Sequence, residues 1–169
     1  MYKRQPYTLE DMADDGVALL DHLEVDKAHI IGASMGGMIA QIIASKYPDR
    51  TSSLVSLMSS PRIPRVSEIS DRNQDNLRNM ENVDAKSAQD YGFYPRAMPR
   101  QLTAIFESGD RSDIVSNISV PTLVLHGEDD TLLPVKYGKL TAELIPNSTL
   151  KTYKAVSYTH LRAHETARH

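Results

Sequence analysis

The sequence predicts an α/β fold built around a parallel sheet, and two segments of the chain carry this prediction. Residues 27–31 and 53–58 are short apolar runs typical of buried strands, and residues 35–47 between them have helical spacing. A second strand–helix–strand run lies between residues 120 and 153. This order of elements indicates a parallel sheet with helices packed on its faces.

The composition is that of an ordinary globular protein. Of 169 residues, 40% are hydrophobic and 24% are charged, which is enough for one domain with a core. The formal net charge of -3 provides no basic surface for nucleic acid, and no apolar run is long enough to cross a membrane. The chain has no cysteine, which excludes thiolate metal sites and fits a cytoplasmic protein. The oligomeric state stays unknown at this stage.

The first helix is expected over residues 8–23. Thr8 is a good N-cap, and Asp11 three residues later completes a pattern that resembles a capping box. Further acidic residues in the first turns suit the positive end of the helix dipole.

A tight turn is expected directly after the strand at 27–31, where the chain reads Gly32-Ala33-Ser34-Met35-Gly36. A GxSxG pattern between a strand and a helix is typical of a nucleophile elbow, a turn that lifts the serine hydroxyl above the sheet within reach of a base. The turn strains the serine backbone, so small residues are expected two positions before and two positions after Ser34.

The same turn favours an oxyanion. The N–H of Met35 is expected at the start of a helix, where backbone donors and the helix dipole attract negative charge. A glycine-rich turn that merely joins strand to helix is the alternative, and the strand before and the helix after it favour the catalytic interpretation.

The second candidate turn follows the strand predicted at 120–126. It carries Asp129 and Asp130 at the carboxyl end of that strand, where open α/β sheets place their sites. The alternative is that both aspartates only form the turn. A helix at 135–144 and a strand at 150–153 follow.

With both turns in view, the chain resembles the α/β-hydrolase superfamily, and most closely its serine esterase-like members. The similarity rests on YTLEDMADDGVALLDHL, HIIGASMGGMIAQIIASKYPDR and VPTLVLHGEDDTLLP. It implies a partial α/β-hydrolase fold with Ser34 as nucleophile and Met35 in the oxyanion hole. The acid of the HGxxDxxxP pattern falls on Asp130 rather than Asp129. A serine nucleophile argues against the epoxide-hydrolase and dehalogenase branches.

The resemblance also implies a division of the chain. Residues 1–60 and 118–154 are expected to form the two parts of the core. The polar, proline-punctuated segment 61–117 is expected to be a helical cap, with helices over 67–90 and 97–108. Family members have further strands before residue 7, whose loops supply a second oxyanion-hole donor, so the chain is expected to be truncated at that end.

The C-terminal end departs from the family pattern. A glycine-flanked catalytic histidine is expected after the last strand, but the chain reads KAVSYTH there. Residues 156–166, VSYTHLRAHET, match the translation of a transposase sequencing adapter, so we expect 155–169 to be a non-native tail. A genuine helical tail is the alternative. We therefore assign no base or metal-binding role to His160 and His164.

These observations predict a hydrolase of carboxylic esters that uses a Ser-Asp-His triad on a small-molecule ester, without metal or organic cofactor. The histidine and part of the oxyanion hole are expected to be missing from this fragment, so residues 1–169 alone are expected to be inactive. Thioesters, lactones and a carbon–carbon bond beside a ketone are compatible with the same triad. The alternative is a catalytically inert fragment or a non-catalytic binding module, because losing the base histidine alone lowers kcat of a serine protease about a million-fold. His22, His29 and His126 are not expected to be the base.

Overall fold

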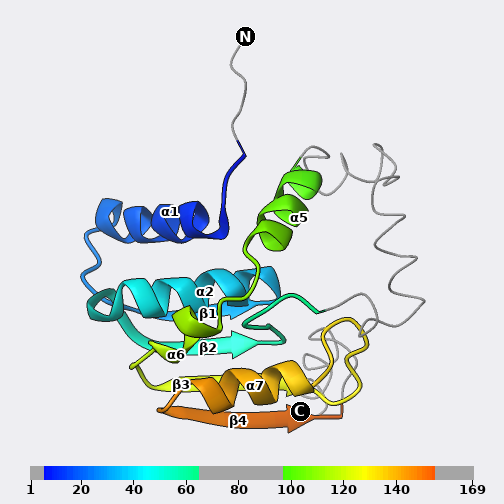
Figure 1. Ribbon diagram of the computed structural model, residues 1–169. Coiled ribbons are helices and arrows are strands. Elements are labelled where there is room, and N and C mark those ends of the chain that lie inside the picture. The colour runs from blue at the N-terminus through cyan, green and yellow to red at the C-terminus, as the bar shows by residue number, and fades with distance from the viewer. Residues whose placement is uncertain (1–5, 65–96, 155–169) are drawn as a thin grey trace, which may run out of the picture.

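A computed structural model of the protein describes residues 6–64 and 97–154 (Figure 1). The elements in these ranges are, in chain order, α1 (Leu9–His22), β1 (Ala28–Ala33), α2 (Met35–Lys46), the 3-10 turn η1 (Pro48–Arg50), β2 (Thr51–Leu57), α5 (Ala97–Glu107), α6 (Ser112–Ser116), β3 (Thr122–Gly127), α7 (Lys136–Leu144) and β4 (Ser148–Tyr153). The helix predicted at 97–108 is therefore confirmed, and the one predicted at 67–90 lies outside the described residues.

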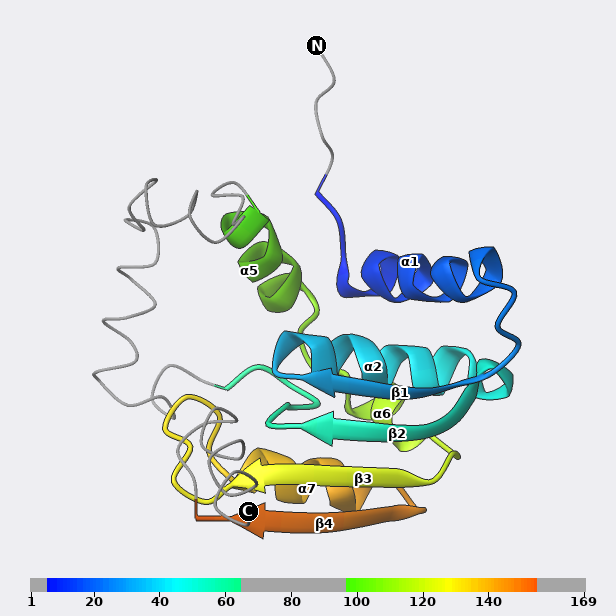
Figure 2. The same ribbon diagram turned by 180° about the vertical axis from the view of Figure 1, so that it is seen from behind.

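The four strands form one parallel sheet in the order β1-β2-β3-β4. Helices α2, α6 and α7 lie on one face of this sheet, and the opposite view shows the strands in front of them (Figure 2). All four arrowheads point the same way, so the carboxyl ends of the strands meet at one edge. The predicted α/β fold with a parallel sheet is confirmed.

Burial alternates along the strands, because successive side chains point to opposite faces. On β3, Val124 and His126 are buried on the face that the helices cover, whereas Leu123 and Leu125 are half-buried on the other. On β1, at one edge of the described sheet, Ile31 is 71% exposed. Among the described elements, the core therefore lies on the helix-covered face.

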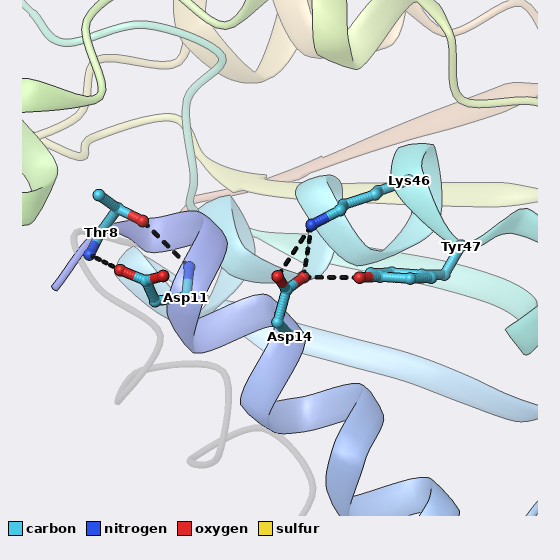
Figure 3. Close-up of polar contacts among 5 residues, drawn as sticks. All are labelled: Thr8, Asp11, Asp14, Lys46 and Tyr47. Atoms are coloured by element: carbon cyan, nitrogen blue, oxygen red, sulfur yellow. Dashed lines mark hydrogen bonds and ion pairs between the residues drawn. The ribbon is translucent and has the colours of Figure 1, made fainter.

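Helix α1 begins with the predicted capping box and is attached to α2 by an ion pair (Figure 3). The Thr8 hydroxyl accepts a hydrogen bond from the Asp11 N–H (3.0 Å), and the Asp11 carboxylate accepts one from the Thr8 N–H (2.8 Å). Further along α1, the Asp14 carboxylate accepts from Lys46 Nζ and from the Tyr47 hydroxyl, both at 2.7 Å. The bond from Lys46 lowers the pKa of Asp14 and raises the pKa of Lys46.

Two apolar clusters hold these layers together. The first joins α1, α2 and α5 through Leu9, Ala13, Val17, Met38, Ile42, Ile43 and Ala104. The second fills the space between α2, the sheet and α6 through Ala40, Ala44, Leu54, Val115, Ile118, Val120 and Ile145. Within the segment expected as the cap, Val115 of α6 therefore packs with the sheet core.

Candidate active site

Ser34 lies at the apex of a tight connection between β1 and α2, since β1 ends at Ala33 and α2 begins at Met35. Its φ of 53° and ψ of -120° are a strained combination for a residue with a Cβ. The Ser34 carbonyl accepts the first hydrogen bonds of α2, from the N–H groups of Gly37 (2.9 Å) and Met38 (3.2 Å). The strand-to-helix turn with strained serine, expected from the sequence, is present.

Of the two glycines that flank Ser34, one is restricted as expected and the other is not. A Cβ on Gly32 would lie 2.0 Å from the carbonyl oxygen of Gly36, so position 32 requires glycine. A Cβ on Gly36, in contrast, meets no described atom within 4 Å. Gly37 is the restricted position after the serine, because its Cβ would lie 2.5 Å from the Cβ of Ser59. The expectation is therefore correct for Gly32 and wrong for Gly36, since Ser59, in the segment that follows β2, lies beside Gly37.

The start of α2 suits an oxyanion. Ser34 occupies the N-cap position, where a serine usually accepts a hydrogen bond from the helix backbone, but within the described chain its hydroxyl makes no such bond. The Met35 N–H lies ahead of the first intrahelical donors, where backbone N–H groups lack intrahelical acceptors. The first turn of α2 carries no acidic side chain to compete for this end of the helix dipole.

The turn after β3 is organised by Asp130. Its Oδ1 accepts hydrogen bonds from the N–H groups of Leu132 and Leu133, both at 2.9 Å. The side chain of Asp130 is only 10% exposed, whereas Asp129 is an exposed residue. Of the two aspartates, Asp130 is therefore the one that the protein encloses.

The topology brings the two turns to the same edge of the sheet. Ser34 follows the carboxyl end of β1, and Asp130 follows that of β3, with only β2 between the two strands. Neighbouring strands lie about 4.8 Å apart, so the two strand ends are separated by about 10 Å. A side chain that follows β4 in the chain would approach the same edge beside Asp130, and residues 155–169 lie outside the described residues.

Within the described residues, neither of the two histidines in the sheet is hydrogen-bonded to Ser34. His29 is exposed on β1, where its Nδ1 lies 2.8 Å from the Ser53 hydroxyl. His126 is fully buried behind the turn of Asp130.

Across residues 6–64 and 97–154, no group of three or more His, Asp or Glu side chains is arranged to hold a metal ion. No helix in these ranges has the length and apolar character of a membrane span.

A parallel sheet with helices on one face and a strained serine between a strand and a helix is the arrangement of an α/β hydrolase. The chain belongs to this family, because the family model described as the alpha/beta hydrolase fold matches residues 2–90, more than half of the chain.

Among the relatives of the chain are a protein named as a lactonase and one named as a depolymerase. The chain is 24% identical over 171 residues to 3-oxoadipate enol-lactonase 2 of Acinetobacter baylyi, which covers 89% of this chain and 64% of that protein. It is 28% identical over 170 residues to the poly(3-hydroxyalkanoate) depolymerase of Ectopseudomonas oleovorans, covering 87% of this chain and 60% of that protein. The chain thus spans less than two thirds of the length of both relatives.

A solved structure extends the likeness to the fold. Est816, described as an N-acyl homoserine lactone degrading enzyme, matches with a TM-score of 0.71 and 25% identity. The match covers 95% of this chain and 72% of that one.

Proposed function

We propose that the protein carrying this chain hydrolyses carboxylic esters of small molecules, with Ser34 as nucleophile and Asp130 as the acid of a Ser-Asp-His triad. The observation that carries the proposal is the backbone of Ser34, held at φ 53° and ψ -120° between a strand and the start of a helix. Strained residues of this kind persist where the surrounding structure imposes them, and they concentrate at active sites.

The proposed reaction begins with attack of the Ser34 hydroxyl on the ester carbonyl, while a histidine accepts the serine proton. We expect that histidine to follow β4 in the native sequence, next to the turn of Asp130, because residues 155–169 are expected to be a non-native tail and supply no base. The Met35 N–H donates to the oxygen that gains negative charge, and the dipole of α2 stabilises it further. The same histidine then protonates the leaving alcohol. Water hydrolyses the acyl ester formed on Ser34 and releases the carboxylic acid product.

The roles of the acid and the cap complete the proposal. Asp130 accepts a hydrogen bond from the base and stabilises its cation. The segment 61–117 acts as a cap that shapes the pocket for the acyl or alcohol part of the substrate.

Lactones are cyclic esters, and polyhydroxyalkanoates are joined by ester bonds, so the names of the relatives support ester chemistry. The absence of cysteine is consistent with a cytoplasmic enzyme.

The test compares p-nitrophenyl acetate and butyrate hydrolysis by the complete gene product and by its Ser34→Ala variant. We expect the substitution to lower kcat about a million-fold, as loss of the nucleophile does in a serine protease. A fluorophosphonate probe should label the parent protein at Ser34 and leave the variant unlabelled. Equal hydrolysis by the two proteins would overturn the assignment of Ser34.

A further inference from the structure

A buried histidine lies directly behind the turn of Asp130. His126 is the penultimate residue of β3, and its side chain is fully buried. Its Nε2 lies 2.6 Å from the carbonyl oxygen of Leu133 and 3.9 Å from Oδ2 of Asp130. Because a carbonyl oxygen can only accept a hydrogen bond, Nε2 must carry the ring proton and donate it to Leu133.

Leu133 connects this histidine to the proposed catalytic acid. Its N–H donates to Oδ1 of Asp130 (2.9 Å), and its carbonyl accepts from Nε2 of His126 (2.6 Å). Both polar groups of the Leu133 backbone are thereby engaged, and its side chain is buried. From the described residues, Oδ2 of Asp130 accepts no hydrogen bond, so this oxygen is available to a base.

Helix α7 holds the histidine ring in place. A Cβ on Gly138 would lie 2.6 Å from Nδ1 of His126 and 2.8 Å from its Cγ, so only a glycine at this position lets the helix approach the ring. Nδ1 has no hydrogen-bond partner among the described residues, which agrees with a ring whose one proton is on Nε2. The ring is therefore confined between β3, α7 and the turn.

We propose that His126 is a positioning residue for the acid: its hydrogen bond to Leu133 fixes the turn so that Oδ2 of Asp130 is presented to the base. This inference rests on the proposed function. His126 is not itself a proton carrier in this scheme, because it is sealed from solvent and its one N–H is already bonded to Leu133.

Two amide substitutions of His126 distinguish the effect of its hydrogen bond to Leu133 from the effect of filling the buried space. The amide nitrogen of glutamine reaches about as far from the backbone as Nε2 of histidine, whereas that of asparagine reaches only as far as Nδ1. His126→Gln is therefore expected to keep a kcat for p-nitrophenyl butyrate close to that of the parent enzyme. His126→Asn is expected to lower kcat about 100-fold, since a displacement of about 1 Å in a catalytic group has an effect of this size.

The Michaelis constant distinguishes positioning from a general loss of structure. KM should stay unchanged in both variants, because Asp130 acts on the base and not on substrate binding. His29→Asn is the matched control: it makes the same change at the exposed histidine of β1 and should leave kcat unchanged. Circular dichroism and thermal unfolding establish that each variant is folded.

A spectroscopic measurement on the parent protein needs no variant. Long-range ¹H–¹⁵N correlation of ¹⁵N-histidine-labelled protein should show His126 protonated at Nε2 and unprotonated at Nδ1. The opposite tautomer would overturn the inference, because Nε2 could not then donate to Leu133.

The activity results separate this inference from the proposed function. Equal kcat values for folded His126→Asn and His126→Gln, with Ser34→Ala inactive, would overturn the role of His126 alone. If Ser34→Ala retains the parent rate, the proposed function fails, and the positioning role fails with it. The inference is supported if kcat is low in His126→Asn but not in His126→Gln, and if the parent protein has the Nε2 tautomer.

Discussion

The backbone N–H of Ser34 donates a hydrogen bond of 3.0 Å to the carbonyl of Leu57. This bond extends the ladder between β1 and β2, because Ala33, the last residue of β1, pairs with Leu57. The Ser34 N–H is thus bonded to the neighbouring strand, although the φ of Ser34, at 53°, is far from that of a strand residue. The strain at Ser34 is imposed by contacts with a segment more than twenty residues away in the chain.

Replacing Ser34 by glycine should stabilise the protein while removing the proposed nucleophile. Relief of the strained backbone contributes about 1–3 kcal/mol, and the greater freedom of glycine in the unfolded chain offsets up to about 1 kcal/mol of this. Urea unfolding of Ser34→Gly should therefore show a higher midpoint than that of the parent. Ser34→Ala is the control, since alanine keeps a Cβ and the strain. Equal stability of the two variants would contradict the account.

Two adjacent glycines of α2 should respond to alanine in opposite ways. A Cβ on Gly36 meets no described atom, so Gly36→Ala should stabilise the helix by up to about 1 kcal/mol. A Cβ on Gly37 would lie 2.5 Å from the Cβ of Ser59, so Gly37→Ala should destabilise the protein by about 1–3 kcal/mol. Denaturant unfolding of both variants measures the difference, and the same sign for both would refute the close approach of Ser59 to Gly37.

Substitutions of Asp130 should separate its structural role from its proposed catalytic role. Asparagine keeps an oxygen that can accept from the N–H groups of Leu132 and Leu133, so Asp130→Asn should keep nearly the parent stability. Alanine removes this acceptor and should lower the free energy of unfolding by about 1–3 kcal/mol.

Both Asp130 variants should lose ester hydrolysis, with kcat of the asparagine variant falling about 10⁴-fold, because a neutral amide does not hold the base in the correct tautomer or stabilise its cation. Kinetics on p-nitrophenyl butyrate and thermal unfolding of the same preparations test the pair. An asparagine variant with the parent kcat would rule out Asp130 as the acid.

The contact between α1 and α2 should make stability depend on acid pH. Hydrogen bonds from Lys46 and Tyr47 hold the pKa of Asp14 below its ordinary value of 3.8 in the folded protein. The contribution of Asp14 to the free energy of unfolding is therefore complete above pH 3.8, and it is lost as the pH falls through the lower pKa of the folded protein.

Asp14→Asn should therefore unfold at a lower temperature than the parent near neutral pH, and the difference should shrink below pH 3.8. Thermal unfolding followed by circular dichroism at several pH values measures this. Asp15→Asn is the matched control, because Asp15 is an exposed neighbour on α1 that makes no ion pair with the described residues. A pH-independent difference between parent and Asp14→Asn would contradict the assignment.

Much of the fold was predictable because the signals are local. The capping box of Thr8 and Asp11 involves residues three apart, and the strand, glycine turn and helix around Ser34 follow one another directly in the chain. The parallel sheet follows from two such units. Element ends were less predictable: β1 continues through Gly32 and Ala33, which the sequence places in the turn, because both residues pair with β2.

The sequence by itself determined the class of fold and the two turns of the candidate site, since spacing along the chain carries that information. Only the tertiary structure decided that Gly37 is restricted by Ser59 while no described atom restricts Gly36, and that His126 is bonded to Leu133 against the backbone of Gly138. These relationships depend on how closely a strand and a helix approach each other. That distance results from the packing of all the layers together and leaves no periodic pattern in the sequence.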